Sequence, residues 1–373
     1  MNIFKQYMKY MKNFDLTLFI AVIILSIIGV LLVSSATLSF SNAKTIMTIQ
    51  ICATILGIIL CVCISLFDYE ILGENYRYII GFNIFILILV LFIGKGAEEV
   101  GGKSWIRFGP IGIQPAEIAK IGFIISFAFQ LDKYKEKINN FFVVIGCLIH
   151  IGVLVFLIMQ QPDFGTTMVF IAVFLVMMFV AKISYKYILT ALIAAPPIFA
   201  GLWFFVFKEF QRNRILNFLN PSMDTQISGY QVMQSKTAIG SGKVFGQGLF
   251  KGILTQNNLL PAKHTDFIFA VAGEELGFVG AIAILLLIVF IVIRCFYIAY
   301  NAKDALGTLI ALGVGTMILV QSFENIGMTV GATPVTGITL PFLSYGGSSM
   351  ITNFAAIGLV INVKIRNKKL NFS

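Results

Sequence analysis

Charged residues are scarce in this sequence, and their scarcity excludes an ordinary water-soluble enzyme. Only 12% of the 373 residues are charged, whereas 58% are hydrophobic. An average soluble domain is about 25% charged and about 45–50% apolar. We therefore expect an all-α integral membrane protein, folded as a single polytopic domain over residues 1–373.

Cysteines are also few, and they indicate neither a disulfide framework nor a zinc site. All five fall inside or at the edge of apolar runs, and Cys61 and Cys63 would lie on different faces of a helix. Their expected role is that of small core side chains. Repeats of 20 to 50 residues and low-complexity tracts are absent as well.

Long apolar runs are abundant, and they predict about ten membrane-spanning helices. A helix needs about 20 residues to cross the hydrocarbon core of a bilayer. The first run is longer than the roughly 7–15 residues of a secretion signal core, so it is expected to be a retained helix. The predicted spans are residues 14–36, 45–66, 77–94, 113–131, 141–159, 164–181, 187–207, 267–293, 305–332 and 343–363.

Basic residues are distributed unevenly over the predicted loops. Cytoplasmic loops of membrane proteins carry an excess of Lys and Arg, which predicts that both termini face the cytoplasm. The short segments on that side hold Lys5, Lys9, Lys12, Arg77, Lys133, Lys135, Lys137, Lys182, Lys186, Arg294, Lys303, Lys364, Arg366, Lys368 and Lys369. The short opposite loops hold only Lys44, Lys95, Lys103 and Arg107.

A long extracytoplasmic segment, residues 208–266, is predicted between the seventh and eighth spans. Long loops in compact proteins are usually functional, and this one is basic. A basic surface beside the outer leaflet suits an anionic ligand such as a lipid phosphate. The alternative is that its lysines only keep a long loop solvated. Its charged residues are Lys208, Glu209, Arg212, Arg214, Asp224, Lys236, Lys243, Lys251, Lys263 and Asp266.

Two charged residues fall in the fourth span, where charge is costly. Glu117 and Lys120 are three residues apart, and this spacing places them on one face of a helix. Charged residues in a membrane normally face the bundle interior or a wet cavity, often as a pair. The pair is either part of a functional site or a structural ion pair near the interface.

Uncharged and acidic polar residues also interrupt two other spans. In the ninth span Gln321, Glu324 and Asn325 cluster, and Gln321 and Asn325 are expected to face the bundle. His150 stands alone in the fifth span, where we expect a hydrogen-bonded packing residue.

Aspartates stand at the outer ends of two spans, Asp163 before the sixth and Asp266 before the eighth. Either can act as an N-cap, accepting hydrogen bonds from unpaired backbone N–H groups. For Asp163 this structural role is favoured. Asp266 closes the long basic segment at the membrane face, where a reactive group could meet a lipid-borne substrate.

Specific strings extend over nearly the whole chain: Gly102–Ile106, Gln114–Lys120, Gln161–Thr166, Asn220–Pro221 with Asp224, Gly229–Gln231, Gln234–Ser235, Ala238–Gly242, His264–Ala270, Glu274–Gly277 and Pro334–Ser349. In order and in spacing, these strings resemble the SEDS family (shape, elongation, division and sporulation). Within that family Ala238–Gly242, His264 and Asn325–Met328 look more like the RodA, or elongation, branch than the FtsW, or division, branch.

The resemblance implies a ten-span peptidoglycan glycosyltransferase that polymerises lipid II at the outer face of the bacterial cytoplasmic membrane. Asp266 matches the family's essential Asp, as a general base or as a ligand of a divalent cation such as Mg²⁺ or Mn²⁺. No cofactor is otherwise implied, and no metal site is assigned. The alternatives are a lipid II flippase, a scaffold for a partner enzyme, and the division or sporulation branch.

Candidate substrate-binding residues follow from the need to hold a sugar and a diphosphate. Cations stabilise the charge that develops on the leaving diphosphate, and Arg grips phosphate oxygens in bidentate fashion. Trp105 either packs on a sugar or prenyl chain or anchors the membrane interface. The candidates are Trp105, Arg107, Gln114, Glu117, Lys120, Arg212, Arg214, Lys236, His264 and Thr265, with Lys263 as a further cation.

Three residues depart from the family pattern: Lys243, Lys263 and Thr339. Lys263 stands where Glu is usual, and we expect its charge to alter the pKa of Asp266. The implied partners are lipid II, a class B penicillin-binding protein and other membrane proteins of the elongation complex, with no nucleic acid. The partner would supply the transpeptidase, because the chain lacks a Ser-x-x-Lys nucleophile domain.

Overall fold

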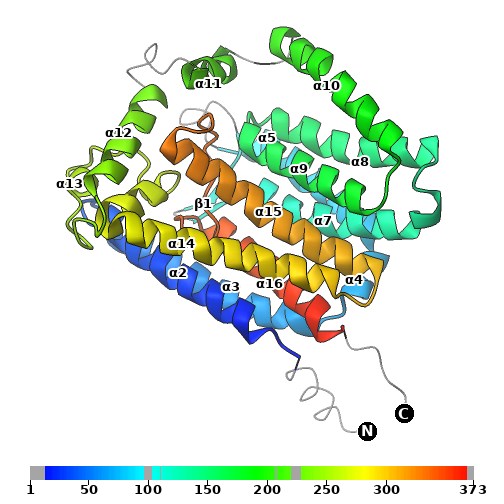
Figure 1. Ribbon diagram of the computed structural model, residues 1–373, viewed down its shortest axis with the longest axis horizontal. Coiled ribbons are helices and arrows are strands. Elements are labelled where there is room, and N and C mark those ends of the chain that lie inside the picture. The colour runs from blue at the N-terminus through cyan, green and yellow to red at the C-terminus, as the bar shows by residue number, and fades with distance from the viewer. Residues whose placement is uncertain are drawn as a thin grey trace.

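The computed structural model describes residues 13–95, 103–109, 111–205, 207, 209–219 and 228–367, and these are almost entirely helical (Figure 1). The long helices are α2 (Leu16–Thr37), α3 (Ala43–Leu66), α5 (Tyr76–Ile93), α7 (Pro115–Lys133), α8 (Phe141–Met159), α9 (Phe164–Val180), α10 (Tyr185–Phe205), α14 (Ile268–Tyr300), α15 (Ala305–Val330) and α16 (Gly347–Ile365). The short elements are α4 (Tyr69–Glu74), a 3₁₀ turn (Lys135–Lys137), α11 (Glu209–Leu219), α12 (Ser228–Ser241), α13 (Ile253–Gln256), and a hairpin of β1 (Ile106–Phe108) and β2 (Ile111–Ile113).

Each predicted span coincides with one of the long helices, and the chain is an all-α integral membrane protein. Among the described residues, eight helices are long and apolar enough to cross a membrane. Two of the long helices do not meet these requirements. Helix α9 has only 17 residues, and α7 has 19 residues but carries the charged residues Glu117, Lys120, Asp132 and Lys133. The count of ten spans therefore stays a prediction.

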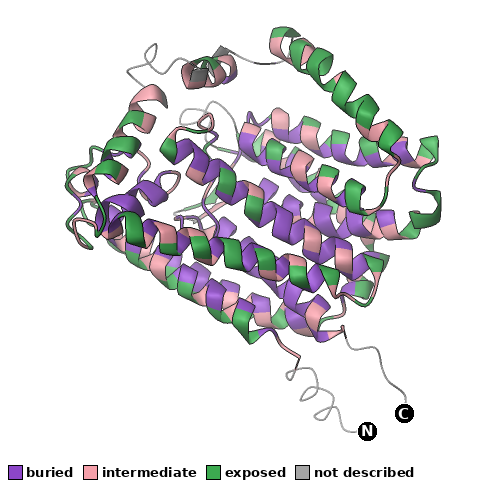
Figure 2. Cartoon of the chain, in the orientation of Figure 1, coloured by how far each residue is buried: buried purple, intermediate pink, exposed green. Residues whose placement is uncertain are grey.

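The centre of the bundle is formed by α15 and α16, which Figure 2 shows as largely buried. Close helix approach there depends on small residues, as is usual in membranes. A methyl group at Gly57 of α3 would lie 2.6 Å from the ring of Phe354 on α16. A methyl group at Gly358 would lie 2.7 Å from the carbonyl oxygen of Cys61.

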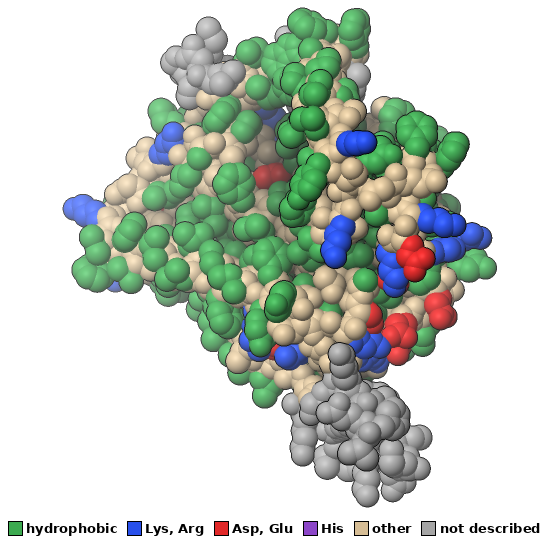
Figure 3. All heavy atoms as spheres, turned by 45° about the vertical axis from the view of Figure 1, so that its right-hand side comes forward, with side chains coloured by type: hydrophobic (Ala, Val, Ile, Leu, Met, Phe, Trp, Pro, Cys, Tyr) green, Lys and Arg blue, Asp and Glu red, His purple; other side chains and the backbone are tan. Residues whose placement is uncertain are grey.

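The two ends of the described chain meet at one end of the bundle. The Asn13 side chain donates to the carbonyl oxygen of Ile365, 3.4 Å away. Charged side chains gather toward that end (Figure 3). Its ion pairs are Arg294–Asp15, Lys303–Glu70, Lys303–Asp304 and Arg366–Asp68. The predicted cytoplasmic segments are thus together, although Lys5, Lys9, Lys12, Lys368 and Lys369 lie outside the described residues.

The predicted long outer segment contains regular structure that its polar composition did not indicate. Three helices form there: α11, α12 and α13. Asn220–Pro221 and Asp224, part of the family-like pattern, lie outside the described residues, as do Lys208 and Gly102. Helix α10, which enters this segment, has no buried residues and diverges from the bundle in Figure 1.

Candidate active site

Asp266 lies in the turn of residues 261–267 that leads into α14, and it is half-buried. The N-cap of α14 is Phe267, and no side chain caps this helix. The N-cap role considered for Asp266 is therefore wrong, because the helix begins one residue later than that role requires. The carboxyl group of Asp266 is not used to cap the helix.

The backbone of this turn is held by side chains from the end of the chain. The amide of Asn325 on α15 donates to the carbonyl oxygens of Asp266, at 2.8 Å, and of Ile338, at 2.7 Å. The Ser344 hydroxyl donates to the carbonyl oxygen of Thr265 at 2.6 Å. Asn325 thus joins the Asp266 turn to the loop between α15 and α16.

His264 has a packing position in the same turn. Its ring packs edge-on against Phe40, with centroids 5.3 Å apart, and lies 5.5 Å from the ring of Tyr345. Burial, with a smaller effect of the Lys263 charge, lowers the pKa of His264 to about 4. The imidazole is therefore neutral at physiological pH and supplies no positive charge for a diphosphate.

The environment of Asp266 favours a carboxyl group that titrates near physiological pH. Burial raises its pKa to about 6; a hydrogen bond from Thr265 and the charge of Arg214 lower it, and the charge of Asp163 raises it. The loop at Gly337, whose φ is +75°, passes so close that a methyl group there would lie 3.7 Å from Asp266 Oδ2. A base with a pKa near 6 is mostly ionised at pH 7 and suits general base catalysis.

Asp163 joins two parts of the site. As predicted, it caps its helix: its carboxylate accepts from Thr166 N at 3.0 Å and from the Thr166 hydroxyl at 2.8 Å. It also accepts from Gln114 Nε2 at 2.8 Å, so it links the start of α9 to the start of α7. Burial raises the pKa of Asp163, and the charge of Lys120 lowers it.

Glu117 and Lys120 form the predicted pair on one face of α7. Lys120 Nζ lies 2.8 Å from Glu117 Oε1, and the two residues are only 3% and 4% exposed. The Thr352 hydroxyl of α16 lies 3.3 Å from Glu117 Oε2. Lys120 also acts electrostatically on Asp163 and on the buried Glu324 of α15. These charges form one connected group that includes Asp266, through Asp163.

Arg214 is the cation that acts on Asp266. It is half-buried on α11, and its Nη1 lies 3.5 Å from the carbonyl oxygen of Thr336. Arg214 and the exposed Lys236 line one small cavity of about 30 Å³. Arg212 instead donates to the carbonyl oxygen of Phe204 on α10, 3.1 Å away.

Two candidates lie in the hairpin that precedes α7. Trp105 is half-buried, and a methyl group at Gly112 on the opposite strand would lie 3.1 Å from its ring. Arg107 is exposed on β1. The hairpin leads directly to Gln114, whose side chain donates to Asp163. The substrate contacts of Trp105 and Arg107 stay predictions.

Lys263 was expected to alter the pKa of Asp266, and the structure contradicts this expectation. Its side chain is buried, and its ammonium group donates to the carbonyl oxygen of Thr255 and, at 3.2 Å, to the Ser39 hydroxyl. The carboxylates that act on it are those of Glu274 and Glu275 on α14. The expectation that it tunes Asp266 is wrong, because its ammonium group is directed to these glutamates and the cation acting on Asp266 is Arg214.

No group of three or more acidic, histidine or cysteine side chains that could hold a metal occurs in the part of the chain that is described. A magnesium ion bound mainly through substrate phosphates needs only one or two protein carboxylates. Asp266, whose carboxylate caps no helix, is the residue that could supply one such ligand.

Three of these residues have larger roles than their sequence positions indicated. The cap role was favoured for Asp163, and its charge also acts on Asp266, Arg214 and Glu324. Asn325 was expected to face the bundle, and its amide also holds the Asp266 turn. Glu324 was noted only as part of the polar cluster of the ninth span, and the charges of Asp163 and Lys120 act on it. These contacts join residues far apart in the chain, so no local sequence pattern marks them.

A family model described as a cell cycle protein, FtsW/RodA/SpoVE, matches residues 15–369. The chain is 35% identical to the "Probable peptidoglycan glycosyltransferase FtsW" of Geobacter metallireducens, covering 98% of each protein. It is 36% identical to the peptidoglycan glycosyltransferase MrdB of Escherichia coli, covering 80% of this chain and 79% of MrdB.

Two solved structures are similar over most of the chain. One belongs to work on the "structural coordination of polymerization and crosslinking by a peptidoglycan synthase complex", with a TM-score of 0.81, 28% identity, and 94% and 97% of the two chains covered. The other is the rod shape determining protein RodA of Thermus thermophilus, with a TM-score of 0.70, 26% identity, and coverage of 94% and 96%.

Proposed function

The chain belongs to the FtsW, RodA and SpoVE family of cell cycle proteins, and on that premise we propose that it is a peptidoglycan glycosyltransferase that polymerises lipid II. Relatives of both the FtsW and the MrdB type carry the name of this activity. The protein acts as one polytopic domain in the cytoplasmic membrane, with both termini in the cytoplasm and Asp266 at the outer face.

The observation that carries this proposal is the setting of Asp266. Chain growth requires a sugar hydroxyl to attack the anomeric carbon of a lipid-linked sugar while the diphosphate departs. A carboxylate that takes the hydroxyl proton typically contributes 10² to 10⁴-fold to the rate. Asp266 fits this role because its pKa is about 6, its side chain caps no helix, and its backbone is tied by Asn325.

The leaving diphosphate needs positive charge, and Arg214 is the first candidate. It acts on Asp266 electrostatically and shares a small cavity with Lys236. A guanidinium stays protonated and presents a planar fork to phosphate oxygens. Lys120 lies further inside the bundle and reaches this group through Asp163. A divalent cation held by Asp266 and the diphosphate would add charge neutralisation.

A lipid II flippase is the second candidate function, favoured by one observation. Glu117, Lys120 and Glu324 are buried charged residues on helices that pack in the bundle, and such residues often mark transport paths. Polymerisation needs only the outer part of this group, whereas transport needs a polar path from the other side.

The partner we propose is a class B penicillin-binding protein that cross-links the strands made by this chain. A similar structure comes from work that names both polymerization and crosslinking by one synthase complex. Other elongation-complex membrane proteins are further proposed partners.

Within the family we propose a role in elongation and cell shape. Ala238–Gly242, His264 and Asn325–Met328 support the RodA-like branch. The Geobacter metallireducens relative, which matches over 98% of its length, is named FtsW, and this favours division as the alternative. A fluorescent fusion separates the two: we expect signal along the side wall, and enrichment confined to the septum would favour division.

The activity itself is tested with purified lipid II and the purified protein, with and without its transpeptidase partner. We expect glycan strands to form in detergent or in vesicles, where no transport is needed. Transfer of lipid II across vesicle membranes without any polymer would instead support the flippase.

A further inference from the structure

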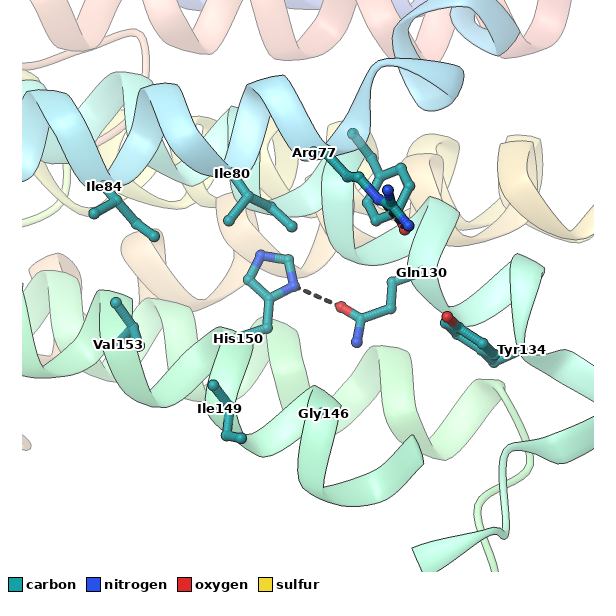
Figure 4. A pocket seen from close by; sticks show the side chains of 10 residues that line it. Arg77, Ile80, Ile84, Gln130, Tyr134, Gly146, Ile149, His150 and Val153 are labelled. Carbon is teal, nitrogen blue, oxygen red and sulfur yellow. Dashed lines mark hydrogen bonds between the residues drawn. The ribbon is translucent and has the colours of Figure 1, made fainter. Parts of the chain in front are cut away.

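A second cavity lies at the end of the bundle opposite Asp266. It has a volume of about 340 Å³, within the range of roughly 300–1,000 Å³ that is usual for ligand sites. Helices α5, α7 and α8 form it, as Figure 4 shows. Its lining residues are Tyr76, Arg77, Ile80, Ile84, Gln130, Tyr134, Gly146, Ile149, His150 and Val153.

The mouth of this cavity is basic. Arg77 Nε donates to the Tyr76 hydroxyl at 3.2 Å, and Lys133 Nζ donates to the same hydroxyl at 3.4 Å. Both cations also lie over the Tyr76 ring, 5.8 and 5.4 Å from its centroid. In the described part of the chain no carboxylate forms an ion pair with either cation. Two exposed positive charges therefore meet at one hydroxyl without an acidic partner.

The cavity becomes apolar away from its mouth. Ile80 and Ile84 of α5 face Ile149 and Val153 of α8 across it (Figure 4). Ile149 is 60% exposed and Val153 is 38% exposed, so this side opens toward the bilayer. The distance along α5 from Arg77 to Ile84 is roughly 10 Å at 1.5 Å per residue.

The back wall is polar but internally satisfied. His150 Nδ1 lies 2.7 Å from Gln130 Oε1, and His150 Nε2 lies 3.3 Å from the Ser126 hydroxyl. His150 is thus the hydrogen-bonded packing residue that its sequence position predicted. Arg77 is therefore the charged residue that lines the cavity, and Lys133 lies beside it, bound to the hydroxyl of the lining residue Tyr76.

We propose that this cavity is a binding site for an anionic phospholipid of the leaflet at the end of the bundle where Asn13 and Ile365 meet. The phosphate lies between Arg77 and Lys133, and one acyl chain runs along the apolar wall. Basic pockets between membrane helices bind such head groups. A zwitterionic lipid would place its own cation beside Arg77 and Lys133 and is disfavoured. This site is separate from Asp266 and does not depend on the proposed function.

The test is native mass spectrometry of the delipidated protein, titrated with phosphatidylglycerol or with phosphatidylcholine of the same acyl chains. Wild type is expected to prefer phosphatidylglycerol by about 25-fold, since each cation near a lipid phosphate contributes about five-fold. The variant R77Q/K133Q is expected to lose this preference. The matched control K135Q/K137Q removes the same charge from the adjacent exposed segment and is expected to keep it.

A second variant tests the cavity without changing charge. A methyl group at Gly146 would lie 3.8 Å from Gln130 Nε2, an ordinary contact, and the longer side chain of Gly146→Leu would take up space in the cavity that Gly146 lines. We expect it to weaken binding of phosphatidylglycerol at least ten-fold with the protein still folded. Three results would overturn the site: an unchanged preference in R77Q/K133Q, an equal loss in K135Q/K137Q, or full binding by the Gly146→Leu variant. Tighter binding of a polyprenyl diphosphate than of phosphatidylglycerol would also overturn the proposal, because it would assign the cavity to a substrate-like lipid instead of a phospholipid.

Discussion

At the scale of single residues, the charge state of Asp266 decides whether it can act. Its pKa of about 6 means that the carboxyl group is protonated below that pH and ionised above it. A general base must be ionised, so the rate of polymerisation should rise with pH around a midpoint near 6 and then level off.

The neighbours of Asp266 allow this assignment to be checked by a shift of the midpoint. Arg214 lowers the pKa of Asp266 and Asp163 raises it. Arg214→Gln should therefore move the midpoint up and Asp163→Asn should move it down, whatever either does to the maximal rate. A midpoint that both variants leave in place would assign the titration to another group.

The buried pair on α7 offers a second test at this scale. Breaking a buried ion pair by removing one partner costs about 3–5 kcal/mol, whereas neutralising both is often tolerated. We expect Glu117→Gln and Lys120→Met each to lower thermal stability and activity. The double variant E117Q/K120M should regain stability but not polymerisation, if this pair also serves the substrate.

The same helix supplies the control for that experiment. Asp132 pairs with Lys135 at 3.2 Å with the same three-residue spacing, but Lys135 is 63% exposed. Asp132→Asn should change neither stability nor activity, because exposed ion pairs contribute about 0–1 kcal/mol. Recovery of polymerisation by E117Q/K120M would show that the pair has a structural role only.

The sequence could predict pairs that one helix sets, but not those made across the fold. Glu117 and Lys120 followed from their spacing, and Asp163 from its place before a helix. The contacts of Lys263 could not be predicted in this way. Its ammonium group is held by Ser39 and Thr255, and neither contact follows from its position close to Asp266 in the chain. The tether from Asn325 to Asp266 likewise joins residues 59 positions apart.

At the scale of elements, a break in α14 attaches the outer segment to the bundle. Gly277 has φ +69° and ψ −167°, a conformation in which a side chain is strained. The backbone groups released there bind residues 243–248: Phe278 N donates to Lys243 O at 2.9 Å, and Gln247 N donates to Glu274 O at 2.9 Å. The run of apolar residues predicted one continuous helix over 267–293. A break at a single glycine does not interrupt such a run when the freed backbone groups find partners in another segment, so the sequence did not reveal it.

This break predicts an unusually sensitive glycine. A methyl group at Gly277 would lie 2.2 Å from the backbone nitrogen of Gly246. Strained backbone costs about 1–3 kcal/mol per residue, and the clash adds to it, so Gly277→Ala should sharply reduce the yield and melting temperature of the purified protein. Gly152→Ala on α8 is the control, since nothing lies within 4 Å of its added methyl group. Equal melting temperatures for the two variants would contradict this account.

At the scale of the whole molecule, the bundle has two chemically different ends. One joins the described termini and carries the ion pairs of Arg294, Lys303 and Arg366. The other carries Asp266, Asp163 and Arg214. Apolar runs and loop charges predicted this arrangement well, because bilayer thickness fixes span length. They did not predict α11, α12 and α13, which lack an apolar signal of that length.

The orientation is tested by cysteine labelling in intact cells, in a variant without the five native cysteines. A cysteine at the exposed Lys251 in the outer segment should react with a membrane-impermeant reagent. A cysteine at Lys135 should react only after the cells are made permeable. The reverse pattern would invert the topology and place Asp266 in the cytoplasm.

The central claim, that Asp266 is the catalytic carboxylate, is tested most directly by lipid II polymerisation with purified Asp266 variants. Asn keeps the size of Asp but cannot accept a proton at neutral pH, and no helix cap is lost because Phe267 occupies that position. Glu keeps the charge but displaces it by about 1 Å, which can cost on the order of 10²-fold in rate. We predict wild-type activity, far lower activity for Asp266→Glu, and background activity for a folded Asp266→Asn. Normal glycan strands from the Asn variant would contradict the account and transfer the search to Glu117.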